Sequence, residues 1–281
     1  TALTSYGTNA QSKIEYRIEG TDLAHIQLGT SNAQTLSVSF YVKSNKTGNT
    51  AIGLINQNND RSFVHQYTIA SANTWQRVSF KVVGDTTGTW NKNTSIGMRM
   101  RWGTFGTDYQ TGTFDAWQAG QKMATSNSPI NFNSATGDYI QITGVQVELG
   151  DTATSFEHRS YGDELQRCRR YYQVLVDQAG GSSQKSFAIA CAYSSGSMHS
   201  THLLSPEMRT VPTLDYTTGT DYYRAFSNGS ADPFNDFTLV GNSHPHAVDL
   251  AVFSNLSVTS GSAVLVRTYN SAARVAFTSE L

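Results

Sequence analysis

The chain has little of what several protein classes require. Its 281 residues include only 2 Cys and 5 Pro, and 15% of them are charged. The two cysteines, Cys168 and Cys191, cannot form a disulfide framework, and neither lies in a C-x-x-C metal-binding pattern. No apolar stretch approaches the about 20 residues of a membrane span. We therefore expect a soluble protein without membrane insertion, in which both thiols are reduced and buried as small apolar groups.

An excess of charge of one sign is also missing. The 20 basic residues are balanced by 21 acidic ones, and the formal net charge is -1 at pH 7. Proteins that bind a phosphate backbone need clustered Lys and Arg, and the longest basic run here is Arg167 to Arg170. The sequence therefore predicts no nucleic-acid partner.

Motifs of known catalytic sites are absent from the sequence as well. It has no G-x-S-x-G, no H-E-x-x-H and no phosphate-binding Gly loop. Asp108, Asp115 and Glu148 are carboxylates of the kind that hydrolyse polysaccharides when two of them lie about 5 to 10 Å apart. Depolymerases of that type are usually long repeat solenoids, and no repeat occurs in this chain. We expect the protein not to be an enzyme.

What the sequence does contain is material for strands and turns. Ser, Thr, Asn and Gly are abundant, and 11% of the residues are aromatic. Apolar residues recur with period two between residues 13 and 149, in segments separated by Gly, Asn and Thr. About seven such segments suit a two-sheet sandwich of jelly-roll type. They lie at 14–18, 36–42, 52–55, 63–69, 78–82, 96–102 and 139–149.

The period of the pattern changes between Gly144 and Gln173, which marks the boundary between two modules. Ser160 and Asp163 have the spacing of a capping box, and a short helix is predicted from about Gly162 to Tyr172. Beyond it, alternation resumes. We therefore expect an all-β protein made of a jelly-roll domain at 1–155, a connecting helix at 156–173 and a second β-rich domain at 174–281. In that last domain Phe187, Ile189, Cys191 and Tyr193 alternate, and we expect their shared face to point inward.

The long connection from residue 103 to 133 is the first place to look for a site, because loops of that length are commonly functional. It contains Tyr109, Asp115 and Trp117, and Trp102 stands at its entrance. A sugar ring stacks on an aromatic face and gives its hydroxyls to polar side chains, so these four residues are our glycan-binding candidates. The alternative is that the aromatic residues only plug the open end of the sandwich.

The boundary also carries a resemblance. The runs ITGVQVELG and ATSFEHRSYGDELQRCRRYYQ closely resemble a junction in tail-fibre and related virion-surface proteins of tailed bacteriophages, particularly marine phages of cyanobacteria. RWGTFGTDYQTGTFDAWQAGQK, SPEMRTVPT and the ending FTSEL resemble further elements of the same proteins, so the likeness covers most of residues 75 to 281. Trp102 and Trp117 fall on the two tryptophan positions of that family.

The resemblance implies a homotrimeric protein of the virion surface, assembled in the bacterial host cytoplasm. It implies attachment to the host through multivalent binding to a cell-surface glycan, by a jelly roll similar to carbohydrate-binding modules. Because the sequence begins at Thr1, we expect an upstream segment that joins other virion proteins. Tail, neck and head fibres all remain open, as do the host and its receptor. The alternative function is a structural head or neck decoration without glycan recognition.

No cofactor is expected, apart from a structural calcium of the kind found in carbohydrate-binding jelly rolls. Glu148 and Asp151 are the candidate calcium ligands, although no D-x-D-x-D-G loop is present. His244 and His246, followed by Asp249, form a second metal candidate, since residues two apart on a strand point to the same side. A polar turn around Pro245 is the alternative interpretation.

Overall fold

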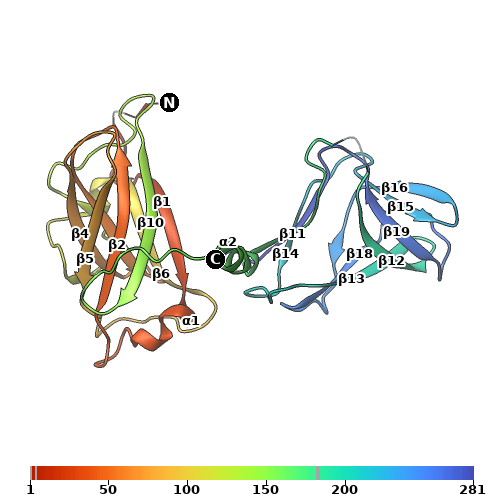
Figure 1. Ribbon diagram of the computed structural model, residues 1–281, viewed down its shortest axis with the longest axis horizontal. Coiled ribbons are helices and arrows are strands. Elements are labelled where there is room, and N and C mark those ends of the chain that lie inside the picture. Colours follow the sequence, from red (N-terminus) through yellow and green to blue (C-terminus); the bar gives the residue numbers. More distant parts are fainter. Residues whose placement is uncertain (1, 4, 182–183) are drawn as a thin grey trace. The chain divides into compact units, whose positions relative to one another are not determined.

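The computed structural model describes residues 2–3, 5–181 and 184–281, and residue 1, where we expect an upstream segment to join, lies outside them. The chain divides into two compact units (Figure 1). The described residues up to His158, with Leu281, form the N-terminal unit, and Arg159–Glu280 form the C-terminal unit. Regular structure is nearly all β, which confirms the predicted fold class. No helix in the described ranges is long and apolar enough to cross a membrane.

The N-terminal unit is a sandwich of two antiparallel sheets. The five-stranded sheet has the order β1 (Gln11–Glu19), β6 (Ile96–Phe105), β3 (Gly48–Asn56), β4 (Arg61–Ile69) and β8 (Trp117–Ala119). The three-stranded sheet has the order β10 (Ile140–Leu149), β2 (Leu36–Ser44) and β5 (Gln76–Val82).

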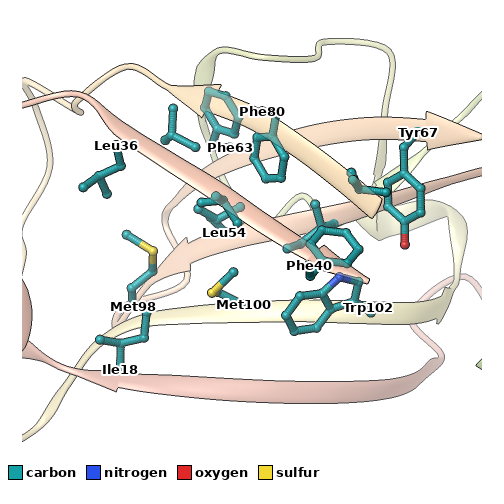
Figure 2. Packing of buried hydrophobic residues seen from close by; sticks show 14 of the residues in the cluster. Ile18, Leu36, Phe40, Leu54, Phe63, Tyr67, Phe80, Met98, Met100 and Trp102 are labelled. Atoms are coloured by element: carbon teal, nitrogen blue, oxygen red, sulfur yellow. The ribbon is translucent and has the colours of Figure 1, made fainter. Parts of the chain in front are cut away.

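Large apolar side chains from both sheets fill the space between them (Figure 2). Phe40 of β2 meets the edge of Trp102 at a centroid distance of 5.4 Å and the edge of Tyr67 at 5.5 Å. Edge-to-face pairs of this kind add packing energy beyond the area they bury. β1 is less well covered, because it ends a five-stranded sheet that faces only three strands. Ile14 and Tyr16 are 42% and 53% exposed, whereas Ile18 reaches the core.

The connection after β6 lies partly over the outer face of the five-stranded sheet. It contains the 3-10 turn η2 (Thr107–Tyr109) and two short strands, β7 (Gln110–Thr111) and β9 (Ala124–Thr125), which pair in parallel. A Cβ on Gly53 of β3 would come within 2.7 Å of the Met123 Cα, so glycine is needed for this close approach. The connection thus covers the β3 and β4 side of the outer face. Two short helical elements, α1 (Gly20–Leu23) and η1 (Ala24–Ile26), follow β1.

The predicted helix is present as α2 (Tyr161–Arg169). Ser160 caps it, because its Oγ accepts a hydrogen bond from the Asp163 amide at 3.1 Å. The second bond of the predicted capping box joins the two side chains, because the Asp163 carboxylate accepts a hydrogen bond from the Ser160 hydroxyl at 2.8 Å. The helix ends before Tyr172, where the next strand begins. The expectation that Cys168 is buried was wrong, since Cys168 is exposed and α2 buries none of its side chains within the described residues.

The C-terminal unit contains a second pair of sheets. Its seven-stranded sheet has the order β16 (Ser230–Phe234), β15 (Tyr223–Ser227), β19 (Ala263–Thr268), β12 (Ser186–Ser194), β13 (Ser197–Leu203), β18 (Ala247–Val252) and β17 (Thr238–Leu239). Its three-stranded sheet has the order β11 (Tyr172–Asp177), β20 (Arg274–Thr278) and β14 (Thr213–Tyr216).

The prediction that the face of β12 with Ile189, Cys191 and Tyr193 points inward was wrong. The alanines of this strand, Ala188, Ala190 and Ala192, point into the core, where bulky aromatic rings such as Tyr223 leave room only for small neighbours. Cys191 is exposed, and Ile189 and Tyr193 are 78% and 80% exposed. A shift of register between Ser186 and Ala188 separates Phe187 from this outer face, and the Phe187 ring packs against Tyr223.

Candidate functional site

Trp102 does not present its ring to a ligand. It is 1% exposed and lies in the core of the N-terminal sandwich, so its assignment as a glycan-binding residue is corrected (Figure 2). Its indole Nε1 is buried and finds no hydrogen-bond acceptor among the described residues. The alternation of β6 places Trp102 inward together with Met98 and Met100. Its contribution is therefore to packing.

Trp117 closes the edge of the sandwich. The strand β8 pairs with β4, and the Trp117 ring lies 5.5 Å from the ring of Phe63 and 5.2 Å from that of Trp90. Its Nε1 donates to the carbonyl oxygen of Val83 at 2.6 Å. The Trp117 indole is half-buried and its N–H already has an acceptor. This agrees with the alternative interpretation, in which the aromatic residues only plug the open end of the sandwich.

Asp115 lies next to this plug, and Tyr109 lies elsewhere. The Asp115 carboxylate is 2.6 Å from Nδ1 of His65, and its backbone amide donates to the Val64 carbonyl at 2.9 Å. Tyr109 packs against Phe105 on the outer face of the five-stranded sheet, with ring centroids 6.5 Å apart. The four candidate residues therefore do not form one site.

The metal candidates have other partners. Glu148 accepts hydrogen bonds from the amide and the hydroxyl of Thr154, at 3.1 and 2.5 Å, and Asp151 accepts from Thr152. No group of three or more His, Cys, Asp or Glu in the part of the chain that the structure describes is arranged to hold a metal ion. Glu148 and Asp151 therefore belong to no such group among the described residues.

His244 and His246 stack with centroids 5.7 Å apart and planes 9° apart. Asp249, the third member of that candidate, lies instead 3.1 Å from Nδ1 of His199. The H-x-H-x-x-D spacing therefore does not assemble into one cluster.

A surface that the sequence did not predict lies on the outer face of the seven-stranded sheet. Tyr193, His199 and Phe253 follow one another, with ring centroids 5.7 and 5.4 Å apart. We call these three residues the aromatic row. Tyr193 and Phe253 are 80% and 55% exposed, and the carboxylate of Asp249 lies 3.1 Å from Nδ1 of His199. Exposed rings beside a carboxylate and an imidazole are the groups that a sugar ring and its hydroxyls need.

The sequence could have indicated the aromatic row only through side-chain volume. Residues 186–194 are apolar on both faces, so period two alone does not say which face is buried. Three alanines on one face and larger residues on the other were the available signal. Phe253 follows the end of β18 and belongs to no alternating pattern.

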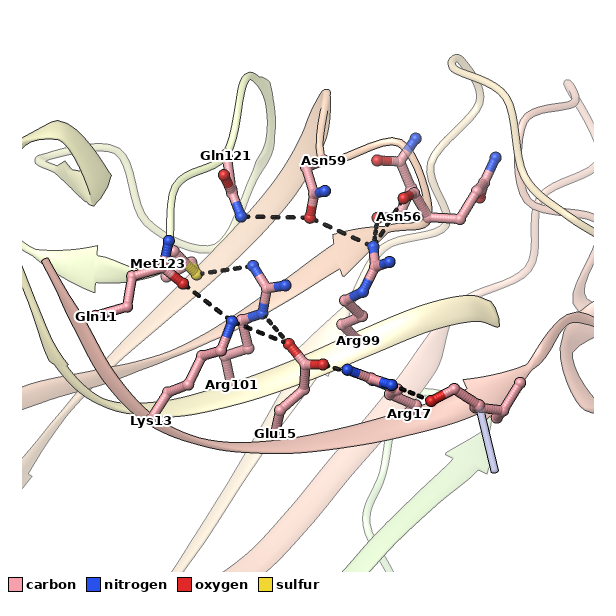
Figure 3. A network of polar contacts seen from close by, with 12 residues as sticks. Gln11, Lys13, Glu15, Arg17, Asn56, Asn59, Arg99, Arg101, Gln121 and Met123 are labelled. Carbon is pink, nitrogen blue, oxygen red and sulfur yellow. Dashed lines mark hydrogen bonds and ion pairs between the residues drawn. The ribbon is translucent and has the colours of Figure 1, made fainter. Parts of the chain in front are cut away.

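A second unpredicted surface is the basic cluster on β1 and β6 of the N-terminal unit. Lys13, Arg17, Arg99 and Arg101 surround Glu15 (Figure 3). Burial raises the pKa of Glu15, but hydrogen bonds from Arg17 and Arg101 outweigh it and lower that pKa to about 2. Burial and the nearby charge of Arg101 lower the pKa of both Lys13 and Arg99.

Comparisons with known proteins add little to this geometry. No protein-family model matches the chain, and no curated protein matches it. Among solved structures, the chain is matched to the N-terminal tandem of two CBM22 domains of Xyn10C from Paenibacillus barcinonensis. The identity is 10% and the TM-score is 0.22, over 100% of this chain and 90% of the other. Because so low a TM-score does not establish a common fold, the function proposed for this protein rests on its own side chains.

Proposed function

We propose that this protein is a non-enzymatic surface protein of a tailed-phage virion that attaches to its host by binding a cell-surface glycan. The aromatic row carries the proposal, because Tyr193 and Phe253 keep ring faces open to solvent beside polar groups. The resemblance of residues 144–173 to tail-fibre junctions supports the location on a virion, in a tail fibre or similar appendage. Such a protein would be made in the host cytoplasm and joined to other virion proteins upstream.

Assembly with itself is part of the proposal. A homotrimer brings three aromatic rows to one target, and linked weak sites gain roughly a hundredfold or more in avidity without any better contact. The tailed-phage resemblance implies this trimer. The exposed side chains of Ile189 and Leu203, at 78% and 82%, also support a surface that becomes covered on assembly.

The second candidate function is a structural decoration or fibre protein of the head or neck. The same two aliphatic side chains favour it, because Ile189 and Leu203 offer no ring face to a sugar but pack well against protein. Under this alternative the aromatic row packs between subunits and binds no glycan.

Substitution within the aromatic row distinguishes the two functions. We expect Tyr193→Ser combined with Phe253→Ser to weaken binding to host glycans on an array at least about tenfold, since full burial of one large ring contributes about 1.5 to 3 kcal/mol. Tyr161→Ser is the matched control, because Tyr161 is 81% exposed on α2, outside the row. Light scattering after gel filtration reports the oligomeric state of all variants.

Loss of glycan binding with an unchanged oligomer supports attachment. Loss of the oligomer with no glycan binding by the unchanged protein supports decoration instead. Release of reducing sugar ends from host polysaccharide would contradict a non-enzymatic role. Antibody labelling of intact particles locates the protein on the tail, neck or head.

A further inference from the structure

The basic cluster lies on two paired strands of the N-terminal unit. β1 and β6 pair along their whole length, and Glu15 lies opposite Arg101 while Arg17 lies opposite Arg99. With period two, the side chains of Lys13, Glu15 and Arg17 share the outer face with Arg99 and Arg101. The connection after β6 covers the neighbouring β3 and β4 and also buries Arg101, whereas Lys13 and Arg17 remain exposed.

One carboxylate does not balance the cluster. Glu15 accepts from Arg17 Nε at 2.6 Å and from Arg101 Nε, and it lies 3.4 Å from Lys13 Nζ. Arg99 donates instead to backbone carbonyls of Asn56 and Gln57, at 3.1 and 2.7 Å. Arg17 Nη1 also donates to the main-chain oxygen of Leu281 (Figure 3). Carbonyls orient a guanidinium but do not neutralise it, so among the described side chains of the cluster four cations face one carboxylate.

Arg101 shows the imbalance most clearly. It is 4% exposed, and besides Glu15 its acceptor is the Met123 sulfur, 3.2 Å from Nη1. A thioether is a weak acceptor for a guanidinium. A buried cation is normally paired and fully hydrogen-bonded, because removing it from water is costly.

We propose that the basic cluster binds an anionic group, a carboxylate, sulfate or phosphate, carried by the glycan that the protein recognises. Such a group relieves the repulsion among the four cations and receives charge-assisted hydrogen bonds from the exposed side chains of Lys13 and Arg17. Arginine presents a planar fork that fits carboxylate and sulfate oxygens. The glycan part of this inference rests on the proposed function, whereas the anion site stands on the geometry of the cluster alone.

Tyr109 lies where the rest of such a ligand would extend. The Met123 amide donates to the Tyr109 carbonyl at 2.9 Å, and the Met123 sulfur accepts from Arg101. Phe105, which is in phase with Arg101 on β6, supports the half-exposed Tyr109 ring. Met123 thus links the turn η2, which carries the Tyr109 ring, to the basic cluster. Of the four glycan-binding candidates from the sequence, Tyr109 is the one that keeps a place in this site.

The test compares fluorescein-labelled dextran sulfate with labelled neutral dextran by fluorescence anisotropy. We expect the unchanged protein to bind dextran sulfate and not dextran, and Lys13→Gln with Arg17→Gln to weaken that binding about tenfold or more. Both side chains are exposed on an end strand, so the fold tolerates the change. Lys81→Gln with Lys92→Gln removes the same charge from exposed positions outside the cluster and serves as the control.

Equal weakening in the control variant would show binding to net charge only and would overturn the proposal. Binding of labelled single-stranded DNA as tight as that of dextran sulfate would point to a nucleic acid and would also overturn it. A third experiment measures the melting temperature of the protein with free sodium sulfate and with dextran sulfate at the same sulfate concentration. If the free salt raises the melting temperature as much as dextran sulfate does, the site takes a free ion and the glycan part fails.

The two proposals fail separately. Loss of neutral-glycan binding in the aromatic-row variant, with dextran sulfate binding retained, supports two independent sites. Retained dextran sulfate binding in the Lys13 and Arg17 variant contradicts the anion site alone.

Discussion

Glu15 holds three cations in place on the outer face of β1 and β6, and it is the acid that balances part of their charge. Its carboxyl has a pKa of about 2 in the folded protein against an ordinary value of 4.5. A carboxyl whose folded pKa is depressed stabilises the fold above its unfolded pKa. That contribution is lost as the pH falls through the folded pKa.

We expect Glu15→Gln to destabilise the N-terminal unit at pH 7 by on the order of 3 kcal/mol, because it removes a pKa difference of about 2.5 units and leaves Arg101 without a carboxylate. The difference from the unchanged protein should shrink as the pH is lowered from 5 towards 2. Urea denaturation at several pH values measures it. Glu157→Gln is the control, since Glu157 is exposed outside the cluster. A penalty for Glu15→Gln that is independent of pH would contradict the assigned pKa.

Individual residues were the hardest part of the site to predict from the sequence. Trp102 and Trp117 look alike in the sequence, yet one is a core residue and the other closes an edge. The basic cluster was hidden because its members come from strands about 80 residues apart and join only through the register of β1 with β6. A search for basic runs finds Arg167 to Arg170 and misses a cluster assembled across strands.

Strands and helices were predicted from the sequence more accurately than individual site residues were. The alternating segments became strands, and Ser160 starts the connecting helix as its spacing predicted. What failed was the choice of the buried face in β12. Both faces are apolar, and the large rings of Tyr223 and its neighbours select the alanine face by volume. Period two identifies a strand but leaves this choice to packing.

The orientation of β12 and α2 predicts the reactivity of the two thiols. Cys191 and Cys168 are both free and exposed. We expect both to react with Ellman's reagent in the native protein within minutes, because exposed thiolates are accessible to the reagent. Cys191→Ser and Cys168→Ser each should remove one equivalent. Labelling that requires denaturant would show that the sequence-based expectation of buried thiols is right after all.

At the scale of the whole molecule, the largest hydrophobic clusters of the described residues lie in separate units. The core around Phe40 and Trp102 lies within the N-terminal unit, and the core around Tyr223 and Phe234 lies within the C-terminal unit. Each unit is longer than the roughly 40 residues below which a single core rarely supports a fold. Cooperative unfolding within each unit is therefore expected.

We expect Trp102→Ala to destabilise the N-terminal unit by about 3 to 5 kcal/mol through the cavity it leaves. The transition of the C-terminal unit should keep its midpoint. Tyr223→Ala, at a residue that is 0% exposed, should destabilise the C-terminal unit and leave the midpoint of the N-terminal unit unchanged. Differential scanning calorimetry of the full chain measures both transitions. Equal shifts of both midpoints in either variant would show that the two units unfold as one.

The place of Lys13 and Arg17 on β1 also bears on how copies of the protein avoid one another. Among the described strands β1 ends its sheet, and the outer edge of an end strand can pair with another strand. Like charges spaced along such a strand repel a second identical strand before it can add to the sheet. Molecules held close together would otherwise risk joining through these edges. The side chains that we propose as an anion site are therefore also a barrier against edge-to-edge aggregation.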